Sequence, residues 1–119
     1  EIKNIDFDKI SDEINTIDIG IFILKNNLSI KASFPTKIAE LFICNKPIIC
    51  NNFNEDIADI INSRTGFLFN EDLSDLSTKN IQVITDLLIN NNKYEYCRDY
   101  ALKNLTISKI IPKILNSYL

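Results

Sequence analysis

The hydrophobic and polar positions along the chain follow two periods, one typical of strands and one typical of helices. Short apolar runs predict strands at 18–24, 47–50 and 67–69, and an imperfect apolar–polar alternation predicts another at 1–7. Apolar residues spaced three and four positions apart predict six helices, at 8–15, 35–45, 56–63, 77–89, 93–102 and 108–118. Strands that alternate with helices are typical of a doubly wound parallel sheet. We therefore predict an α/β domain of Rossmann-like topology that ends in helices.

The strand at 18–24 and the helices on either side of it carry the clearest local signals. The strand is rich in β-branched residues and apolar on both faces, as expected for a central parallel strand covered by helices on each side. In the helix before it, Ile10 and Ile14 are one turn apart and predict the buried face. In the helix after it, Pro35 occupies the first turn, where its missing N–H costs nothing, and Ser33 is the predicted N-cap.

Composition excludes several classes of function. The chain has 119 residues, a formal net charge of −3 and 45% hydrophobic residues, which fits one globular domain. It contains no histidine, which excludes Ser–His–Asp and Cys–His catalysis, histidine metal sites and histidine pH switches. Its acidic balance, with a pI of about 4.9, argues against nucleic acid as a partner. Because the chain does not begin with Met, we expect a piece of a longer protein.

The cysteines and the apolar runs bear on location. Cys44, Cys50 and Cys97 form no Cys-x-x-Cys pair, so buried free thiols in a reducing compartment are favoured over a zinc site. The longest apolar run, 17–24, is interrupted by Asp18 and is too short to cross a bilayer. We therefore expect a cytoplasmic protein without a bound metal.

Two loops after predicted strands, 25–33 and 51–55, are the candidate sites, because ligands of such sheets bind beyond the carboxyl ends of the strands. The first loop holds lysines and serines and leads into a helix whose free N–H groups could bind an anion. Lys37 and Glu40 are three positions apart on that helix. Lys37 could bind a phosphate, and Glu40 could accept hydrogen bonds from a ribose diol. Spacing alone favours a solvated surface pair instead.

Three stretches, taken together, resemble a known family. They are Asp18-Ile-Gly-Ile-Phe-Ile, Lys31-Ala-Ser-Phe-Pro-Thr-Lys-Ile-Ala-Glu-Leu-Phe-Ile-Cys-Asn-Lys-Pro-Ile-Ile-Cys50 and Thr65-Gly-Phe-Leu-Phe69. Their order and spacing resemble the donor-binding domain of GT-B glycosyltransferases, above all the family-four enzymes of bacterial surface-polysaccharide synthesis, such as lipopolysaccharide and capsule. The resemblance spans residues 18–69 and reverses the preference for a surface pair.

The resemblance implies that residues 1–119 are one partial domain, the nucleotide-sugar-binding half of a hexosyltransferase-type enzyme. It implies that Glu40 binds the ribose and that four residues lie against the diphosphate and sugar, namely Lys31, Ser33, Thr36 and Lys37. The donor would be UDP- or GDP-linked, transfer would retain the anomeric configuration, and no metal or other cofactor would be needed. The acceptor, a glycan or a lipid-linked sugar, would bind an absent domain, so the chain alone would be inactive. The parent protein would be cytoplasmic or peripheral at the inner face of the membrane. No catalytic residue is assigned.

The chain departs from the family pattern in ways that keep alternatives open. Ala32 stands where many members have a sugar-contacting glutamate, Asn45 stands where they have glycine, and the family's diphosphate-binding Arg and Lys would lie upstream. A non-catalytic nucleotide-sugar-binding or scaffold domain is one alternative, and a sugar-nucleotide epimerase of the same fold is another. Without the upstream strands, the strand at 18–24 would have a bare apolar edge, covered either by a rearranged amino-terminal segment or by a second copy in a homodimer.

Overall fold

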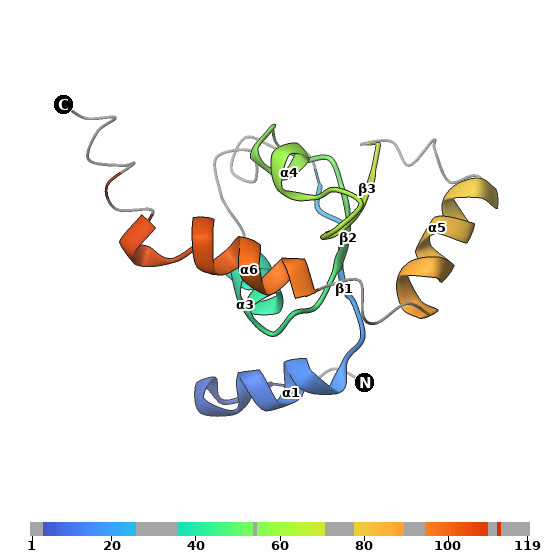
Figure 1. Ribbon diagram of the computed structural model, residues 1–119. Coiled ribbons are helices and arrows are strands. Elements are labelled where there is room, and N and C mark those ends of the chain that lie inside the picture. The colour runs from blue at the N-terminus through green and yellow to red at the C-terminus, as the bar shows by residue number, and fades with distance from the viewer. Residues whose placement is uncertain are drawn as a thin grey trace.

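The computed structural model describes residues 4–25, 36–53, 55–70, 78–89, 95–109 and 112. Its helices are η1 (Phe7–Lys9, a 3₁₀ turn), α1 (Ile10–Thr16), α3 (Thr36–Ile43), α4 (Glu55–Ile60), α5 (Thr78–Ile89) and α6 (Glu95–Asn104). Its strands are β1 (Gly20–Phe22), β2 (Ile48–Asn51) and β3 (Gly66–Phe69). The protein is therefore α/β, with helices and strands close to the predicted ranges from residue 8 onward (Figure 1).

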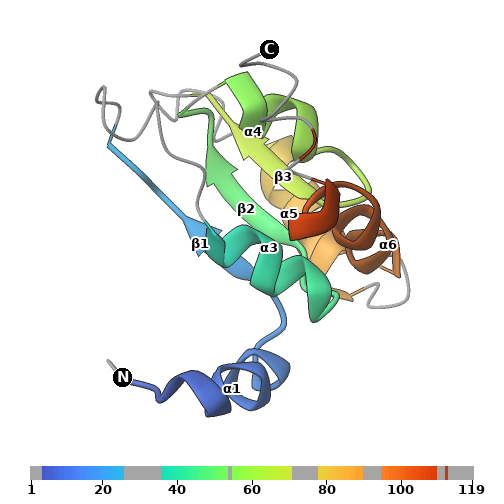
Figure 2. The ribbon, with the colours of Figure 1, turned by 90° about the vertical axis from the view of Figure 1, so that its left-hand side faces the viewer.

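The three strands form one parallel sheet in the order β1-β2-β3, with Gly20 beside Ile48 and Ile48 beside Gly66. The connection from β1 to β2 runs through α3, and the connection from β2 to β3 runs through α4. Each leads to the next strand in the same direction across the sheet. Because such crossovers are right-handed, both helices fall on one face. Helix α6 joins them on that face, and α5 lies on the other (Figures 1 and 2).

The main core lies between the sheet and the face covered by α3, α4 and α6. The predicted buried face of α3 is confirmed, because Ile38, Leu41 and Phe42 are all buried. The Phe42 ring packs edge-on against Tyr100 of α6, with ring centroids 6.2 Å apart. This packing fixes α3 against the sheet and leaves its flank facing α1.

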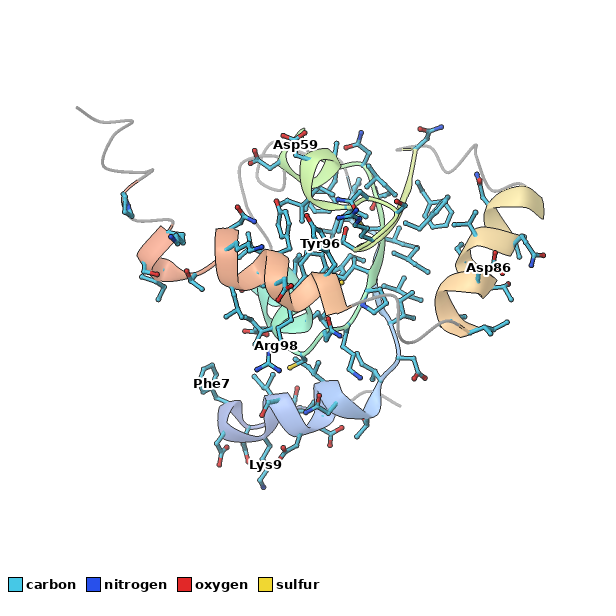
Figure 3. The ribbon with its side chains drawn as sticks, in the orientation of Figure 1. Phe7, Lys9, Asp59, Asp86, Tyr96 and Arg98 are labelled. Atoms are coloured by element: carbon cyan, nitrogen blue, oxygen red, sulfur yellow. The ribbon has the colours of Figure 1, made fainter. Side chains whose placement is uncertain are left out.

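The strand predicted at 1–7 is wrong for the residues that the structure describes. Residues 4–6 are irregular and Phe7 begins a 3₁₀ turn. An apolar–polar alternation specifies a strand only where a partner strand and a buried face are available. Here neither is present, since Phe7 is 87% exposed and lies at the outer end of the helical segment, away from the sheet (Figure 3).

Two further expectations about the amino-terminal half need correction. The predicted central strand, β1, is an edge strand among the described residues, and Ile21 and Ile23 on its outer face are 64% and 63% exposed. Helix α1 forms as predicted, but Ile10 and Ile14 are only half-buried. At the other end of the chain, residues 107–109 and 112 are helical, and the rest of the helix predicted at 108–118 lies outside the described residues.

Asn45 ends α3 in a left-handed backbone conformation. Its φ is +58°, in the left-handed region that glycine adopts at no cost and asparagine tolerates. The Asn45 N–H donates to the Phe42 carbonyl and the Lys46 N–H to the Leu41 carbonyl, both at 2.9 Å, which is the Schellman pattern of a helix end. The Asn45 side-chain oxygen also accepts a hydrogen bond from the Arg98 N–H at 3.3 Å. Asparagine therefore makes the turn and adds a link to α6.

The cysteines agree with the sequence interpretation of free thiols. Cys50 and Cys97 are buried and Cys44 is half-buried, all three reduced. Burial raises the pKa of the Cys50 and Cys97 thiols to about 12. The Cys97 thiol lies 3.8 Å from the carbonyl oxygens of Arg64 and Thr65, so it packs as a small apolar group with two weak acceptors. None of the helices in the described ranges is both long and apolar enough to cross a bilayer.

Candidate functional site

A pocket of about 470 Å³ lies between α1, β1 and the flank of α3. One wall comes from α1 and the residues around it, namely Asn4, Ile5, Ile10, Glu13, Ile14 and Ile17. The other wall comes from β1 and α3, namely Phe22, Lys37, Glu40 and Leu41. The structure therefore brings together on one pocket wall the two charged residues of α3 that the sequence singled out.

The helical geometry of α3 places Lys37 and Glu40 on the pocket. They are three positions apart, so they lie on the same side of the helix, one turn from each other. Ile38 and Phe42 point into the core and hold this flank outward. Lys37 is exposed and lies in the first turn, whereas Glu40 is half-buried. Both residues line the pocket, and Glu40 is the less exposed of the two.

The other predicted donor-binding residues are placed less completely. Thr36 is the first residue of α3 and is exposed, but it is not part of the pocket wall. Lys31 and Ser33, together with Ala32, lie outside the described residues. The described structure thus places Lys37 and Glu40 in one site and leaves the loop before α3 as a prediction.

The α1 wall was missed as a functional element by sequence reasoning. The spacing of Ile10 and Ile14 predicts a core face, but these side chains are half-buried and line the pocket. Ile14 also reaches the edge of the core cluster. A hydrogen bond of 3.3 Å from the Lys46 ammonium to the Asn15 carbonyl ties α1 to the turn after α3. The amphipathic pattern of α1 is the sequence signal for this wall, because the same spacing serves a core face and a pocket wall.

The pocket runs along the flank of α3 rather than over the carboxyl ends of the strands, where the sequence predicted a site. Helix α1 precedes β1, so it meets the sheet at the amino ends of the strands (Figures 1 and 2). In the second predicted loop, 51–55, Asn51 and Phe53 are buried and Asn52 is exposed, and none of these three residues is part of the pocket wall. The described part of that loop therefore does not line the pocket.

Asn51 acts instead as a structural clamp on β1. Its side-chain oxygen accepts a hydrogen bond from the Leu24 N–H at 2.9 Å, and its amide donates to the Leu24 carbonyl at 2.8 Å. The side chain thereby replaces a backbone partner and extends the β1–β2 ladder beyond Phe22. These two hydrogen bonds fix the backbone at Leu24, where the chain leaves β1.

Replacing Asn51 by leucine is expected to lower the free energy of unfolding by about 2 kcal/mol, because both backbone groups of Leu24 lose their partner. Urea unfolding followed by circular dichroism measures this loss. Asn52→Leu is the matched control, since Asn52 is exposed and is expected to change stability by less than about 0.5 kcal/mol. Equal effects at the two positions would contradict the clamp.

The pocket combines apolar walls with one lysine and two glutamates, which suits a ligand that has an apolar part and a polar part rich in hydrogen-bond donors. Its charged side chains are Lys37, Glu40 and Glu13. The described residues contain no group of three or more His, Cys, Asp or Glu side chains that could hold a metal ion. No protein-family model matches the chain, and neither does any curated protein or any solved structure with which it was compared.

Proposed function

We propose that the chain is the donor-binding part of a glycosyltransferase that uses a nucleotide sugar, with a Rossmann-like, doubly wound arrangement of its sheet. The observation that carries the proposal is the common placement of Lys37 and Glu40 on an apolar pocket. The three-stranded parallel sheet with helices on both faces is compatible with part of such a domain. The resemblance of residues 18–69 to the donor domain of family-four enzymes supplies the reaction class.

Each part of a nucleotide sugar has a chemically suited partner in this proposal. The Glu40 carboxylate accepts two hydrogen bonds from the ribose diol. Lys37, one turn nearer the helix start, offsets part of the diphosphate charge together with N–H groups of the first turn of α3. The apolar side chains of Ile10, Ile14 and Phe22 cover the faces of the base.

The proposed reaction is transfer of a hexosyl group from a UDP- or GDP-linked donor to a glycan or lipid-linked acceptor, with retained anomeric configuration. The leaving group is the nucleoside diphosphate, and the positive groups at the start of α3 stabilise its charge without a metal. The acceptor binds outside this chain. The proposed location is the cytoplasm, including the inner face of the membrane.

A non-catalytic nucleotide-sugar-binding module is the second candidate, and Ala32 favours it, because many family members have a sugar-contacting glutamate at this position. The two candidates share the pocket and differ in turnover. A transfer assay on a protein that also contains an acceptor domain separates them, because only the enzyme releases nucleoside diphosphate in step with acceptor glycosylation.

Titration of the ¹⁵N-labelled chain with UDP and with GDP tests the proposed site. At least one nucleotide is expected to shift the amide signals of residues 10–17 and 36–41. Glu40→Gln keeps the size of the side chain and removes its charge, and it is expected to weaken binding about tenfold or more. Asp59→Asn is the matched control, because Asp59 is an exposed carboxylate on α4, at the far end of the molecule from α1 (Figure 3).

Two results would contradict the proposed function. One is the absence of shifts with both nucleotides, and the other is binding that Glu40→Gln leaves unchanged. Shifts confined to the 51–55 loop would move the site to the carboxyl ends of the strands and remove the role of the pocket.

A further inference from the structure

Glu13 places a carboxylate on the side of α1 that lines the pocket. Four residues spaced three and four positions apart share that side of the segment and form part of the pocket wall, namely Ile10, Glu13, Ile14 and Ile17. Glu13 is half-buried there, whereas its neighbour Asp12 is exposed and is not part of the wall. The wall opposite α3 is therefore apolar apart from a hydrogen-bond acceptor set among its isoleucines.

The placement of a nucleotide under the proposed function leaves its base to this wall. Lys37 faces the diphosphate and Glu40 the ribose, both from α3, and the base is the part of a nucleotide farthest from the diphosphate. Ile10 and Ile14 cover the base and flank Glu13 on the same side of α1. The Glu13 carboxylate therefore meets the edge of a base held by those two side chains.

A carboxylate distinguishes the bases by their hydrogen-bond donors, because its two oxygens accept and do not donate. Guanine presents two adjacent donors on one edge, the N1–H and the N2 amino group, so it can pair with both oxygens of a single carboxylate, as a guanidinium does. Uracil presents one N–H between two carbonyl oxygens, which a carboxylate repels. Adenine and cytosine present an amino group beside an acceptor nitrogen. Of the four bases, guanine thus fits Glu13 best.

We infer that the pocket selects guanine nucleotides and that Glu13 reads the base, through paired hydrogen bonds from N1–H and the N2 amino group. The inference rests on the proposed function and narrows its donor to GDP-linked sugars. Each carboxylate of the described pocket wall then has its own task, since Glu40 accepts from the ribose diol and Glu13 from the base. This division accounts for two glutamates beside one lysine in a site for an anionic ligand.

Calorimetric titration of the chain with GDP, inosine diphosphate and UDP tests the base assignment. Inosine diphosphate differs from GDP only in lacking the N2 amino group, so it removes one of the two inferred hydrogen bonds. The chain is expected to bind GDP about tenfold more tightly than inosine diphosphate, and more tightly than UDP by a larger factor.

Glu13→Gln keeps the size of the side chain and replaces one acceptor oxygen by an amino group. It is expected to weaken GDP binding about tenfold or more and to bring GDP and inosine diphosphate within about threefold of each other. The ratio of these two affinities is the decisive readout, because a variant that only loosened α1 would weaken both nucleotides alike. Asp12→Asn is the matched control, since Asp12 is an exposed neighbouring carboxylate off the pocket wall, and both affinities are expected to stay unchanged.

The outcomes separate this inference from the proposed function. Tighter binding of UDP than of GDP would overturn the base assignment and leave the proposed function standing. Equal binding of GDP and inosine diphosphate would do the same, as would a ratio of their affinities that Glu13→Gln leaves unchanged. Failure of all three nucleotides to bind would contradict the proposed function itself, and the inference would fall with it.

Discussion

Replacing Gly66 by alanine is expected to destabilise the chain by about 3 kcal/mol or more, a large share of the stability of a domain of this size. Gly66 has a φ of +155°, which a residue with a side chain rarely adopts and which costs about 1–3 kcal/mol. A Cβ there would also collide with the Ile48 backbone, at its oxygen, carbon and nitrogen. Overpacking against atoms that cannot move adds about 1–3 kcal/mol.

The position of Gly66 is fixed by its neighbours, so the strain cannot be relieved by a small shift. The preceding Thr65 is fully buried, and its hydroxyl donates to the Ile60 carbonyl at 2.7 Å and accepts from the Asn62 N–H at 2.9 Å. The Thr65 carbonyl accepts from the Ile48 N–H at 3.0 Å. Because these bonds set the entry into β3, an alanine at 66 would have to break the β2–β3 pairing.

Urea unfolding followed by circular dichroism measures the effect, with Gly20→Ala as the comparison. At Gly20 the nearest obstacle is the end of the Leu41 side chain, which can turn aside, and the φ is not in the restricted region. The expected loss there is about 1 kcal/mol. If the two alanine variants proved equally stable, the tight approach of β3 to Ile48 would be refuted.

Alkaline pH is expected to destabilise the chain through its buried thiols. Burial raises the pKa of Cys50 and Cys97 from 9.0 to about 12, so the folded chain keeps these protons while the unfolded chain loses them. Stability is therefore complete below pH 9 and falls as the pH rises from 9 toward 12. At about pH 10.5 the expected loss is about 2 kcal/mol for each thiol.

The free energy of unfolding, measured by urea titration at a series of pH values, tests this slope. The double variant Cys50→Ala/Cys97→Ala is expected to be less stable at neutral pH and to lose less stability between pH 8 and pH 10.5. Part of the slope should remain, because burial, Tyr96 and Asp59 raise the pKa of Tyr100 with the same sign. Parallel pH profiles for the two proteins would show that the thiols are not responsible.

The helices and strands from residue 8 onward could be predicted because their signals are local. Helix α3 has apolar residues at helical spacing, and β2 is a short apolar run before a polar turn. The strand predicted at 1–7 failed for residues 4–7 because alternation does not reveal whether a partner strand exists. The same limit affected β1, whose apolar character indicates a buried strand although Ile21 and Ile23 are exposed.

The candidate site could be predicted only where it depends on one helix. The spacing of Lys37 and Glu40 fixes their shared side of α3 wherever that helix packs. The facing wall depends on how α1 is oriented against α3, which is set by the short connection into β1 and by contacts such as Lys46 with Asn15. No local pattern in the sequence encodes that orientation. The position of the pocket along the flank of α3, and not over the strand ends, could therefore not be predicted.

Helix α1 packs only loosely on the rest of the protein, and this loose packing limits how strongly the pocket can bind any ligand. The helix has no buried residue, so separating it from α3 exposes little new apolar surface and requires no change in the sheet. We therefore expect a form with one wall withdrawn to be populated beside the form with the pocket assembled. Measured affinity equals the intrinsic affinity multiplied by the fraction of molecules in the assembled form. Contacts that hold α1 in place, far from any ligand atom, would then tune affinity by changing that fraction.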